Sequence, residues 1–343
     1  MFYNLIKTPV IIKTGNNILG RIDSLLKEVH LVFSKKILIT QETLYEQYKE
    51  ELNKVDFHKI LFVKDGCVEE MSDIVLQCKD EDSLIIAFGG GSVLDIVKYS
   101  ASRMDKPYIT LPSTLSNDAI YSCVARLNNN GKKISYGVQP PIGIIADLDI
   151  IRQSPKKLLL AGVADLISNL SAIQDWILAH NNIGEPINEL AFMLAKEAAL
   201  PILQYKECDL WDDQFLFDLV NGLITSGLSM IVSGDTRGTS GSEHLISHAI
   251  DEHFPGKSTI HGLQVGWAHL LIEKKYRRSI SKYSLEKFFD EMGLTQTIAE
   301  SIQFTENDFP SLIPLAVNIR ERYTILNEIN ENLYHNETTE KFS

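Results

Sequence analysis

The chain has 343 residues, of which 44% are hydrophobic and 23% charged, and its formal net charge is −12 at pH 7. This length exceeds what one ordinary hydrophobic core supports, so two domains are expected. The acidic balance disfavours nonspecific binding to nucleic acid or to an anionic membrane surface, but it allows a small anionic substrate in a local basic pocket.

The four cysteines lie far apart and form no CxxC pair. This spacing argues against a disulfide framework or a cysteine–zinc site and favours a reducing compartment. The N-terminus lacks the long apolar core of a signal peptide, and no run of about 18 apolar residues predicts a membrane span. We therefore expect a cytoplasmic protein with a small-molecule substrate and no membrane or nucleic-acid partner.

The first half of the chain alternates short apolar runs with amphipathic stretches. Amphipathic helices are predicted at 43–55 and 68–80, and a hairpin is predicted around the turn at 128–135. The predicted strands lie at 35–40, 58–63, 83–88 and 107–113 and within 141–155. Strands that alternate with helices predict right-handed βαβ units and a parallel sheet.

After about Pro155 the apolar residues recur at spacings of three and four, which predicts helices. The run 154–181 is predicted as one helix, with Ser154 as its N-cap and Pro155 at its first position. Further helical runs lie at 187–204, 214–234, 242–254, 261–276 and 284–294. The sequence thus predicts an α/β domain over 1–153 followed by an all-helical domain over 154–343.

The stretch FGGGSVLDIVKYSA (88–101) joins a predicted strand to a helix through three glycines. Glycines at a strand end allow close approach of a ligand, and the helix start offers free N–H groups and partial positive charge. This pattern suits a dinucleotide pyrophosphate. A tight strand–helix turn without a ligand remains the alternative, because the stretch does not match the GxGxxG fingerprint.

A polar loop, LPSTLSNDAIYS (111–122), follows the next predicted strand. The carboxyl ends of parallel strands are where ligands bind in such sheets, so this loop is a candidate ligand contact as well as an ordinary polar loop.

Asp165 lies on an apolar helix, where a carboxylate is costly unless it is paired or metal-bound. His244 and His248 are four residues apart and share a helix face, and His261 opens another predicted helix. A single histidine in such a place is more often a core group. One carboxylate together with two imidazoles makes an open site for a divalent metal, which polarises a substrate oxygen.

The order of these motifs resembles that of sn-glycerol-1-phosphate dehydrogenases over roughly residues 85–270. The most specific parts are the run 142–179 and SGSEHLISHAID (240–251). That family belongs with glycerol dehydrogenases, iron-containing alcohol dehydrogenases and 3-dehydroquinate synthases. The resemblance implies a Rossmann-like N-terminal domain and a helical C-terminal domain, with metal, cofactor and substrate in the cleft between them.

Site residues carried over from the resemblance fall into three groups. The implied metal ligands are Asp165, His244 and His261. Substrate contacts are implied for Asp118, Asp165 and His248, of which Asp118 and His248 are the implied catalytic residues. Cofactor contacts are implied for Gly89, Gly90, Gly91, Ser92, Val93, Ser113, Ser116 and Ser122.

The expected function is a metal-dependent, NAD- or NADP-linked dehydrogenase that reduces dihydroxyacetone phosphate to sn-glycerol 1-phosphate. Zinc, nickel and iron all accept this ligand set. Glu42, after the strand 35–40, could accept from a ribose hydroxyl and repel a 2′-phosphate, which favours NAD, or it could equally be an acid at a helix start, stabilised by the helix dipole. The alternatives are a dehydrogenase of glycerol or another small alcohol, and a carbon–oxygen lyase of the 3-dehydroquinate synthase type, which usually has glutamate at the position of Asp165.

Departures from the family pattern concern the substrate side. Asn117 and Ala119 stand where the family usually has histidine and glycine, and Ala164 replaces the glycine before the metal-ligand aspartate. Arg237, just before the histidine pair, is the candidate phosphate contact, and a loop arginine that faces water is the equal alternative. Glu243 is expected to project to another face without a role. The helical domain is compatible with a homo-oligomer as well as with a monomer.

Overall fold

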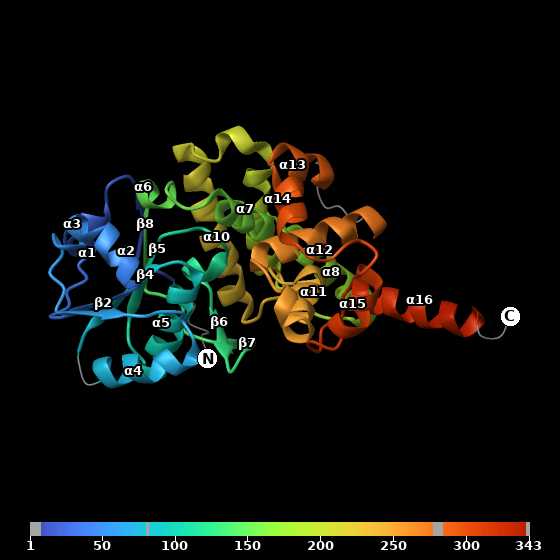
Figure 1. Cartoon of the computed structure of the whole chain (residues 1–343), viewed down its shortest axis with the longest axis horizontal. Helices are drawn as coiled ribbons and strands as arrows, with labels where there is room; N and C mark the ends of the chain where they lie inside the picture. Colours follow the sequence, from blue (N-terminus) through green and yellow to red (C-terminus); the bar gives the residue numbers. More distant parts are fainter. Residues whose placement is uncertain (1–7, 80–81, 277–283, 341–343) are drawn as a thin grey trace.

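The computed structural model describes residues 8–79, 82–276 and 284–340. A sheet with its covering helices forms one half of the molecule and a set of packed helices forms the other (Figure 1). Residues 1–7, which begin the N-terminal stretch that lacks signal-peptide features, lie outside the described residues.

Within the described residues, a six-stranded sheet has the order β1-β8-β5-β4-β2-β3, with every pair parallel. The strands are β1 (Ile11–Gly15), β2 (Lys36–Thr40), β3 (Lys59–Phe62), β4 (Leu84–Gly89), β5 (Tyr108–Pro112) and β8 (Gly143–Asp147). The predicted parallel sheet is confirmed. Strand β1, which the sequence pattern did not reveal, pairs with β8 at one edge.

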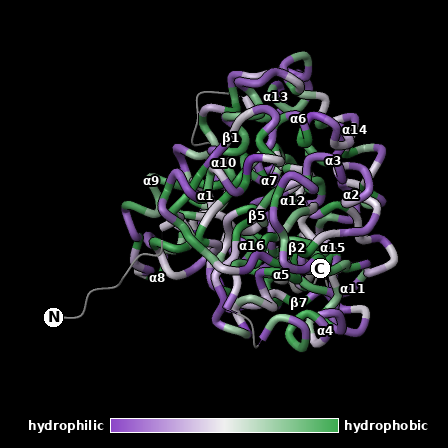
Figure 2. Tube along the Cα trace, turned by 90° about the vertical axis from the view of Figure 1, so that its left-hand side faces the viewer, coloured by the Kyte–Doolittle hydropathy of each residue, from purple (hydrophilic) through white to green (hydrophobic). Residues whose placement is uncertain are grey.

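Both faces of the sheet are covered, because its central strands are apolar on both sides. One face packs on α1 (Ile22–Glu28) and α3 (Lys49–Leu52). The other packs on α4 (Val68–Cys78) and α5 (Gly91–Met104), and its core continues into the helical half. Hydrophobic residues concentrate toward the middle of the trace and hydrophilic ones at its periphery (Figure 2).

Two predicted helices differ in detail from the observed ones. The run 43–55 forms α2 (Glu42–Gln47) and α3, interrupted at Tyr48, whose buried ring packs edge-on against Phe88 with centroids 5.8 Å apart. The run 154–181 forms two helices that meet at Ser168, whose Oγ donates to the Asp165 carbonyl at 2.6 Å. The first of these starts at Lys156, and Ser154 is not its N-cap.

The predicted hairpin is confirmed as β6 (Val124–Asn129) and β7 (Lys132–Gly137). The helical half begins at α6 (Leu148–Ile151) and continues through ten longer helices of the described residues. These are α7 (Lys156–Ile167), α8 (Asn169–Ile183), α9 (Glu189–Ala199), α10 (Asp213–Ser233), α11 (Ser242–His253), α12 (His261–Tyr276), α13 (Leu285–Glu291), α14 (Leu294–Ser301), α15 (Phe309–Ala316) and α16 (Ile325–Glu340).

Two helical stretches of the described chain, Lys156–Ile183 and Asp213–Ser233, are long and apolar enough to cross a membrane by composition. In their most apolar windows 89% and 61% of the residues are buried inside the protein. Core helices meet the same criterion, so packing accounts for this apolar character.

Two glycines let helices of the second half approach the loop that follows β5. A Cβ on Gly162 of α7 would lie 1.8 Å from the Leu115 carbonyl oxygen, and one on Gly227 of α10 would lie 1.6 Å from that of Tyr121. Only glycine fits such a close approach of backbone to backbone. These contacts hold the polar loop against α7 and α10.

We expect Gly162→Ala to lower the free energy of unfolding by about 1–3 kcal/mol, because the added methyl must displace backbone. Urea denaturation midpoints measure the change. Gly256→Ala is the matched control, since a Cβ there meets nothing within 4 Å. Equal midpoints for the two variants would contradict the packing argument.

Candidate active site

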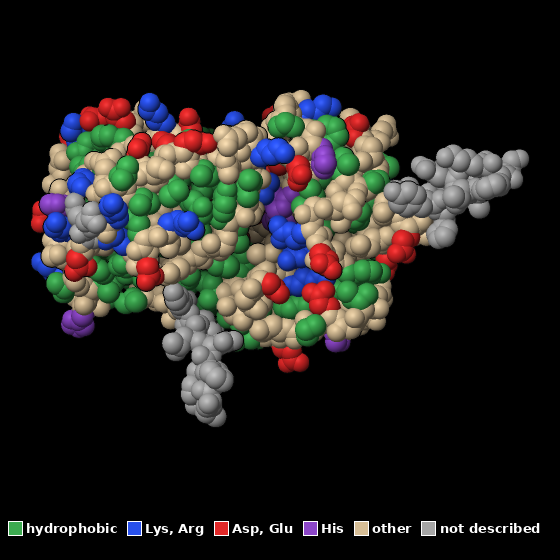
Figure 3. Space-filling view, turned by 90° about the horizontal axis from the view of Figure 1, so that it is seen from below, with side chains coloured by type: hydrophobic (Ala, Val, Ile, Leu, Met, Phe, Trp, Pro, Cys, Tyr) green, Lys and Arg blue, Asp and Glu red, His purple; other side chains and the backbone are tan. Residues whose placement is uncertain are grey.

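A cavity of about 710 Å³ lies where the two halves meet. Its walls come from the glycine turn after β4, the loop after β5, the β6–β7 hairpin, α7, α11 and the start of α12. Figure 3 shows a hollow between the halves, with Lys and Arg side chains gathered beside it. The cavity therefore draws on segments from most of the chain.

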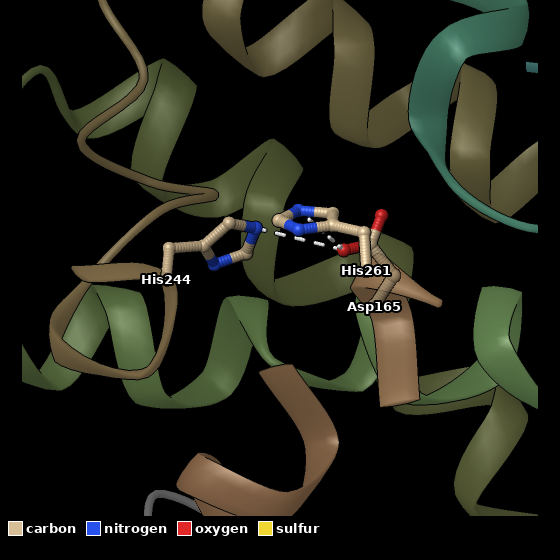
Figure 4. Close-up of side chains that lie close together, drawn as sticks. All are labelled: Asp165, His244 and His261. Atoms are coloured by element: carbon tan, nitrogen blue, oxygen red, sulfur yellow. Dashed lines mark ion pairs between the residues drawn. The ribbon is translucent and has the colours of Figure 1, made fainter. Parts of the chain in front are cut away.

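Three predicted side chains from three helices converge on this cavity (Figure 4). His244 Nε2 lies 3.5 Å and His261 Nε2 lies 3.8 Å from Asp165 Oδ1. Buried Asp165 Oδ1 accepts no hydrogen bond from any described residue. One carboxylate oxygen and two imidazole nitrogens that face each other in this way are a suitable ligand set for a divalent metal ion.

Hydrogen bonds on the far side of both imidazoles orient them. Glu243 Oε1 lies 2.8 Å from His244 Nδ1, and Ser247 Oγ lies 3.0 Å from His261 Nδ1. Each Nε2 is therefore left to face Asp165. The expectation that Glu243 has no role was wrong, because the imidazole of the next residue reaches back to its carboxylate, which helical position alone does not reveal.

The surroundings of Asp165, His244 and His261 shift the pKa values of the two histidines in opposite directions. Burial disfavours the charged form of His244, but its ion pair with Asp165 and its hydrogen bond and ion pair with Glu243 outweigh burial and raise the pKa of His244 to about 9. Burial lowers the pKa of His261 to about 4, and the positive charge of His244 adds to that effect. Two carboxylates around one imidazole make this a site that favours positive charge.

His248 lies one turn after His244 on α11 and borders the same cavity. Its Nδ1 lies 3.4 Å from Nη2 of Arg320. Burial lowers the pKa of His248 well below its usual value, and the charge of Arg126 adds to this. The imidazole is therefore neutral near pH 7, and since Nδ1 accepts a hydrogen bond, Nε2 carries the hydrogen.

Asp118 lies in the loop after β5, at the start of a short 3₁₀ helix (Asp118–Tyr121) that packs against α10 and α7. Its backbone N–H donates to Asp165 Oδ2 at 3.3 Å. Burial, followed by the charge of Asp165, raises the pKa of Asp118 to about 7. This carboxyl group thus borders the cavity and can gain or lose a proton near neutral pH.

Most of the predicted cofactor contacts border the cavity: Gly90, Gly91, Ser92, Val93, Ser113, Ser116 and Ser122. Gly89 does not; a Cβ there would lie 2.6 Å from Val93 Cβ, so this glycine serves the packing of β4 on α5. The Ser122 hydroxyl is already engaged, since it accepts from Lys98 Nζ at 2.9 Å and donates to the Val124 carbonyl at 3.0 Å.

The predicted phosphate contact was wrong. Arg237 is 2% exposed and forms an ion pair with Glu185, and its Nη2 donates to the Tyr323 carbonyl at 2.8 Å. The cations that border the cavity are Arg126, Lys133 and Arg320. No sequence motif identifies these three cations, because the hairpin and the segment after α15 come close to α11 only in the folded chain.

Of the two roles open to Glu42, the structure shows the acid at a helix start and not the cofactor contact. It is exposed at the start of α2, and its neighbour Gln41 borders the cavity instead. Gln41 Nε2 donates to the Lys64 carbonyl at 3.0 Å. After β2 the cavity is therefore bordered by a neutral amide and not by a carboxylate.

Comparisons with known proteins identify the family of this chain. Residues 10–155 match the family model described as iron-containing alcohol dehydrogenase. A glycerol-1-phosphate dehydrogenase (NAD(P)+) from Archaeoglobus fulgidus is 33% identical over 96% of this chain and 95% of its own length. One from Pyrococcus horikoshii is 32% identical over 94% of each chain. The chain belongs to the glycerol-1-phosphate dehydrogenase family.

Solved structures agree on the fold of this family member. Glycerol dehydrogenase from Schizosaccharomyces pombe superposes with a TM-score of 0.71 at 18% identity, over 95% of this chain and 86% of its own. A probable glycerol dehydrogenase from Sinorhizobium meliloti superposes with a TM-score of 0.72 at 17% identity, over 94% and 93%. The predicted fold class and family are confirmed, and the protein is an oxidoreductase.

We expect Glu243→Gln to weaken retention of a divalent metal by about 10- to 100-fold, because the amide removes a negative charge behind His244. Competition with a chromophoric chelator measures the affinity directly, without any assay of activity. Glu252→Gln is the matched control, since Glu252 is exposed on the same helix. Unchanged affinity in Glu243→Gln would show that this carboxylate does not influence the site.

Proposed function

We propose that the protein is a metal-dependent, NAD(P)-linked dehydrogenase that reduces dihydroxyacetone phosphate to glycerol 1-phosphate. The observation that carries this proposal is the position of the Asp165–His244–His261 cluster and the glycine turn on one cavity. In that arrangement a dinucleotide on the turn and a polarised substrate oxygen at the cluster can meet. The names of the relatives support the choice of substrate.

Asp165, His244 and His261 would hold the metal ion. Asp165 Oδ1 is buried and accepts no hydrogen bond from a described residue, and the two imidazoles approach it only to 3.5 and 3.8 Å. A metal ion between the three groups would meet its charge more closely. When bound, a divalent ion supplies Lewis acidity that stabilises negative charge on the substrate oxygen. Zinc, nickel and iron all suit this ligand set.

The glycine turn would bind the pyrophosphate of the cofactor. Helix α5 begins at Gly91, and its first N–H groups have no partner within the helix, which favours an anion there. NAD(P)H supplies the hydride. Neutral Gln41 at the cavity neither repels a 2′-phosphate nor supplies a carboxylate for the ribose, so we propose that both NADH and NADPH are accepted.

His248 and Asp118 would act on the substrate itself. The hydrogen on Nε2 of neutral His248 can be donated to a substrate oxygen, while Arg320 holds Nδ1. Asp118 can hold or release a proton near pH 7. Asp165 would also contact the substrate, because its second oxygen, Oδ2, borders the loop that carries Asp118.

The proposed division of labour follows the two halves. The 1–153 domain would bind the nucleotide, and the 154–343 domain would bind the metal and most of the substrate. Among the described residues no two cysteines are joined by a disulfide, in keeping with a cytoplasmic enzyme. A homo-oligomer is compatible with this arrangement.

The test is a turnover assay on metal-loaded protein with dihydroxyacetone phosphate, using NADH and NADPH in turn. We expect oxidation of both cofactors and glycerol 1-phosphate as the product. Asp165→Ala should lose more than 100-fold in kcat, as estimated from the loss of several kcal/mol of charge stabilisation. It should also fail to retain metal on dialysis.

Asp149→Ala is the matched control, because Asp149 is a partly exposed aspartate whose partner Arg152 lies outside the cavity. Faster turnover of unphosphorylated dihydroxyacetone would favour a small-alcohol dehydrogenase. Release of inorganic phosphate without net cofactor oxidation would identify a lyase instead.

A further inference from the structure

Three cations border the cavity on the side of the hairpin and the segment after α15. We call Arg126, Lys133 and Arg320 the basic cluster. Figure 3 shows Lys and Arg side chains gathered beside the hollow, next to a histidine. Since the chain as a whole carries a formal charge of −12, a local excess of positive charge needs an explanation.

Two members of the basic cluster already have an anionic partner. Arg126 Nη2 lies 2.8 Å and Lys133 Nζ lies 3.5 Å from the carboxylate of Asp251 on α11. Asp251 is buried and also accepts from Ser258 Oγ at 2.6 Å. One carboxylate therefore serves two cations and fixes the hairpin against α11.

Arg320 lacks such a partner. It is half-buried, and no carboxylate of the described residues lies within ion-pair distance of its guanidinium. Its hydrogen bonds go to Thr236 Oγ1 at 3.3 Å and to His248 Nδ1 at 3.4 Å, both neutral groups. Burial, followed by the charge of Arg126, lowers the pKa of Arg320. A cation in this position is costly unless an anion joins it.

Arg322, two residues further on, behaves differently. Its Nη1 donates to the backbone carbonyls of Thr236 and Ser240, and its Nη2 donates to Thr236 Oγ1. These bonds tie the segment after α15 to the loop before α11. Arg322 is thus committed to the structure, and it does not border the cavity.

We propose that Arg320 binds the phosphate group of the substrate and sets the preference for phosphorylated over unphosphorylated trioses. This inference rests on the proposed function and adds the residue that reads the phosphate. Three cations against one carboxylate leave two positive charges, which match a phosphate monoester of about −1.5 to −2 at pH 7. A guanidinium presents parallel N–H donors that suit two phosphate oxygens at once.

The contact with His248 gives this assignment a second consequence. The guanidinium that binds the phosphate also donates to Nδ1 of the histidine whose Nε2 faces the cavity. Arg320 therefore contacts both the phosphate of the substrate and the histidine that faces its reacting oxygen. A substrate without phosphate keeps the histidine contact but loses the charge-assisted bond.

The test compares kcat/KM for dihydroxyacetone phosphate and for dihydroxyacetone in Arg320→Gln, Arg320→Lys and the wild-type enzyme. In Arg320→Gln we expect a fall of about 10- to 150-fold on the phosphorylated substrate, typical for a hydrogen bond to a charged group. The fall on the unphosphorylated substrate should be several-fold smaller, because that substrate loses only the contact of Arg320 with His248. Arg320→Lys should recover part of the loss, because it restores the charge without the paired donors.

Inorganic phosphate provides a second measurement. As a competitive inhibitor against dihydroxyacetone phosphate, it should show a higher inhibition constant in Arg320→Gln than in wild type. Arg21→Gln is the charge-matched control, since Arg21 is exposed and lies outside the cavity. Metal content and thermal midpoint, measured on each variant, identify any loss that comes from misfolding.

The outcomes separate the two proposals. If the wild-type enzyme does not turn over dihydroxyacetone phosphate, the proposed function fails. If it does, but Arg320→Gln keeps the full preference for that substrate, only the role of Arg320 fails. An equal fall on both substrates would overturn phosphate binding and assign Arg320 to positioning His248.

Discussion

The candidate active site depends on one buried carboxylate, Asp165. It lies on α7, where Gly162 allows the helix to touch the backbone of the loop after β5. One oxygen accepts the Asp118 N–H at 3.3 Å, and the other faces His244 and His261 without a donor. A carboxylate in an apolar core is unfavourable unless its charge is met, so this group calls for a cation.

Electrostatics divides the cavity into regions of opposite character. Asp165, Glu243 and Asp118 make the region around His244 favourable for positive charge. A short distance along α11, the basic cluster exceeds its one carboxylate, Asp251, and is favourable for negative charge. A substrate with a polarisable oxygen at one end and a phosphate at the other fits this division, and His248 lies between the two regions.

Much of the fold was predictable because it rests on local patterns. Runs of β-branched and aliphatic residues identified five of the six strands of the sheet, and the three-residue and four-residue spacing identified most of the helices. The edge strand β1 was missed, since β8, the strand with which it pairs in the described part of the chain, lies about 130 residues away in the sequence. The break at Ser168 was missed because a side-chain hydrogen bond to Asp165, rather than a glycine or proline, ends α7.

Residue type and spacing were enough to predict the alternation of elements and to place one aspartate and three histidines as metal-site candidates. The resemblance to the family then singled out Asp165, His244 and His261. Only the tertiary structure decided the partners of charged groups. It paired Arg237 with Glu185, brought Glu243 behind His244 and set Arg320 beside His248. An ion pair or hydrogen bond depends on distances of a few ångströms between atoms. Arg237 and Glu185, 52 positions apart, and Arg320 and His248, 72 positions apart, reach such distances only when the helices of the second half pack.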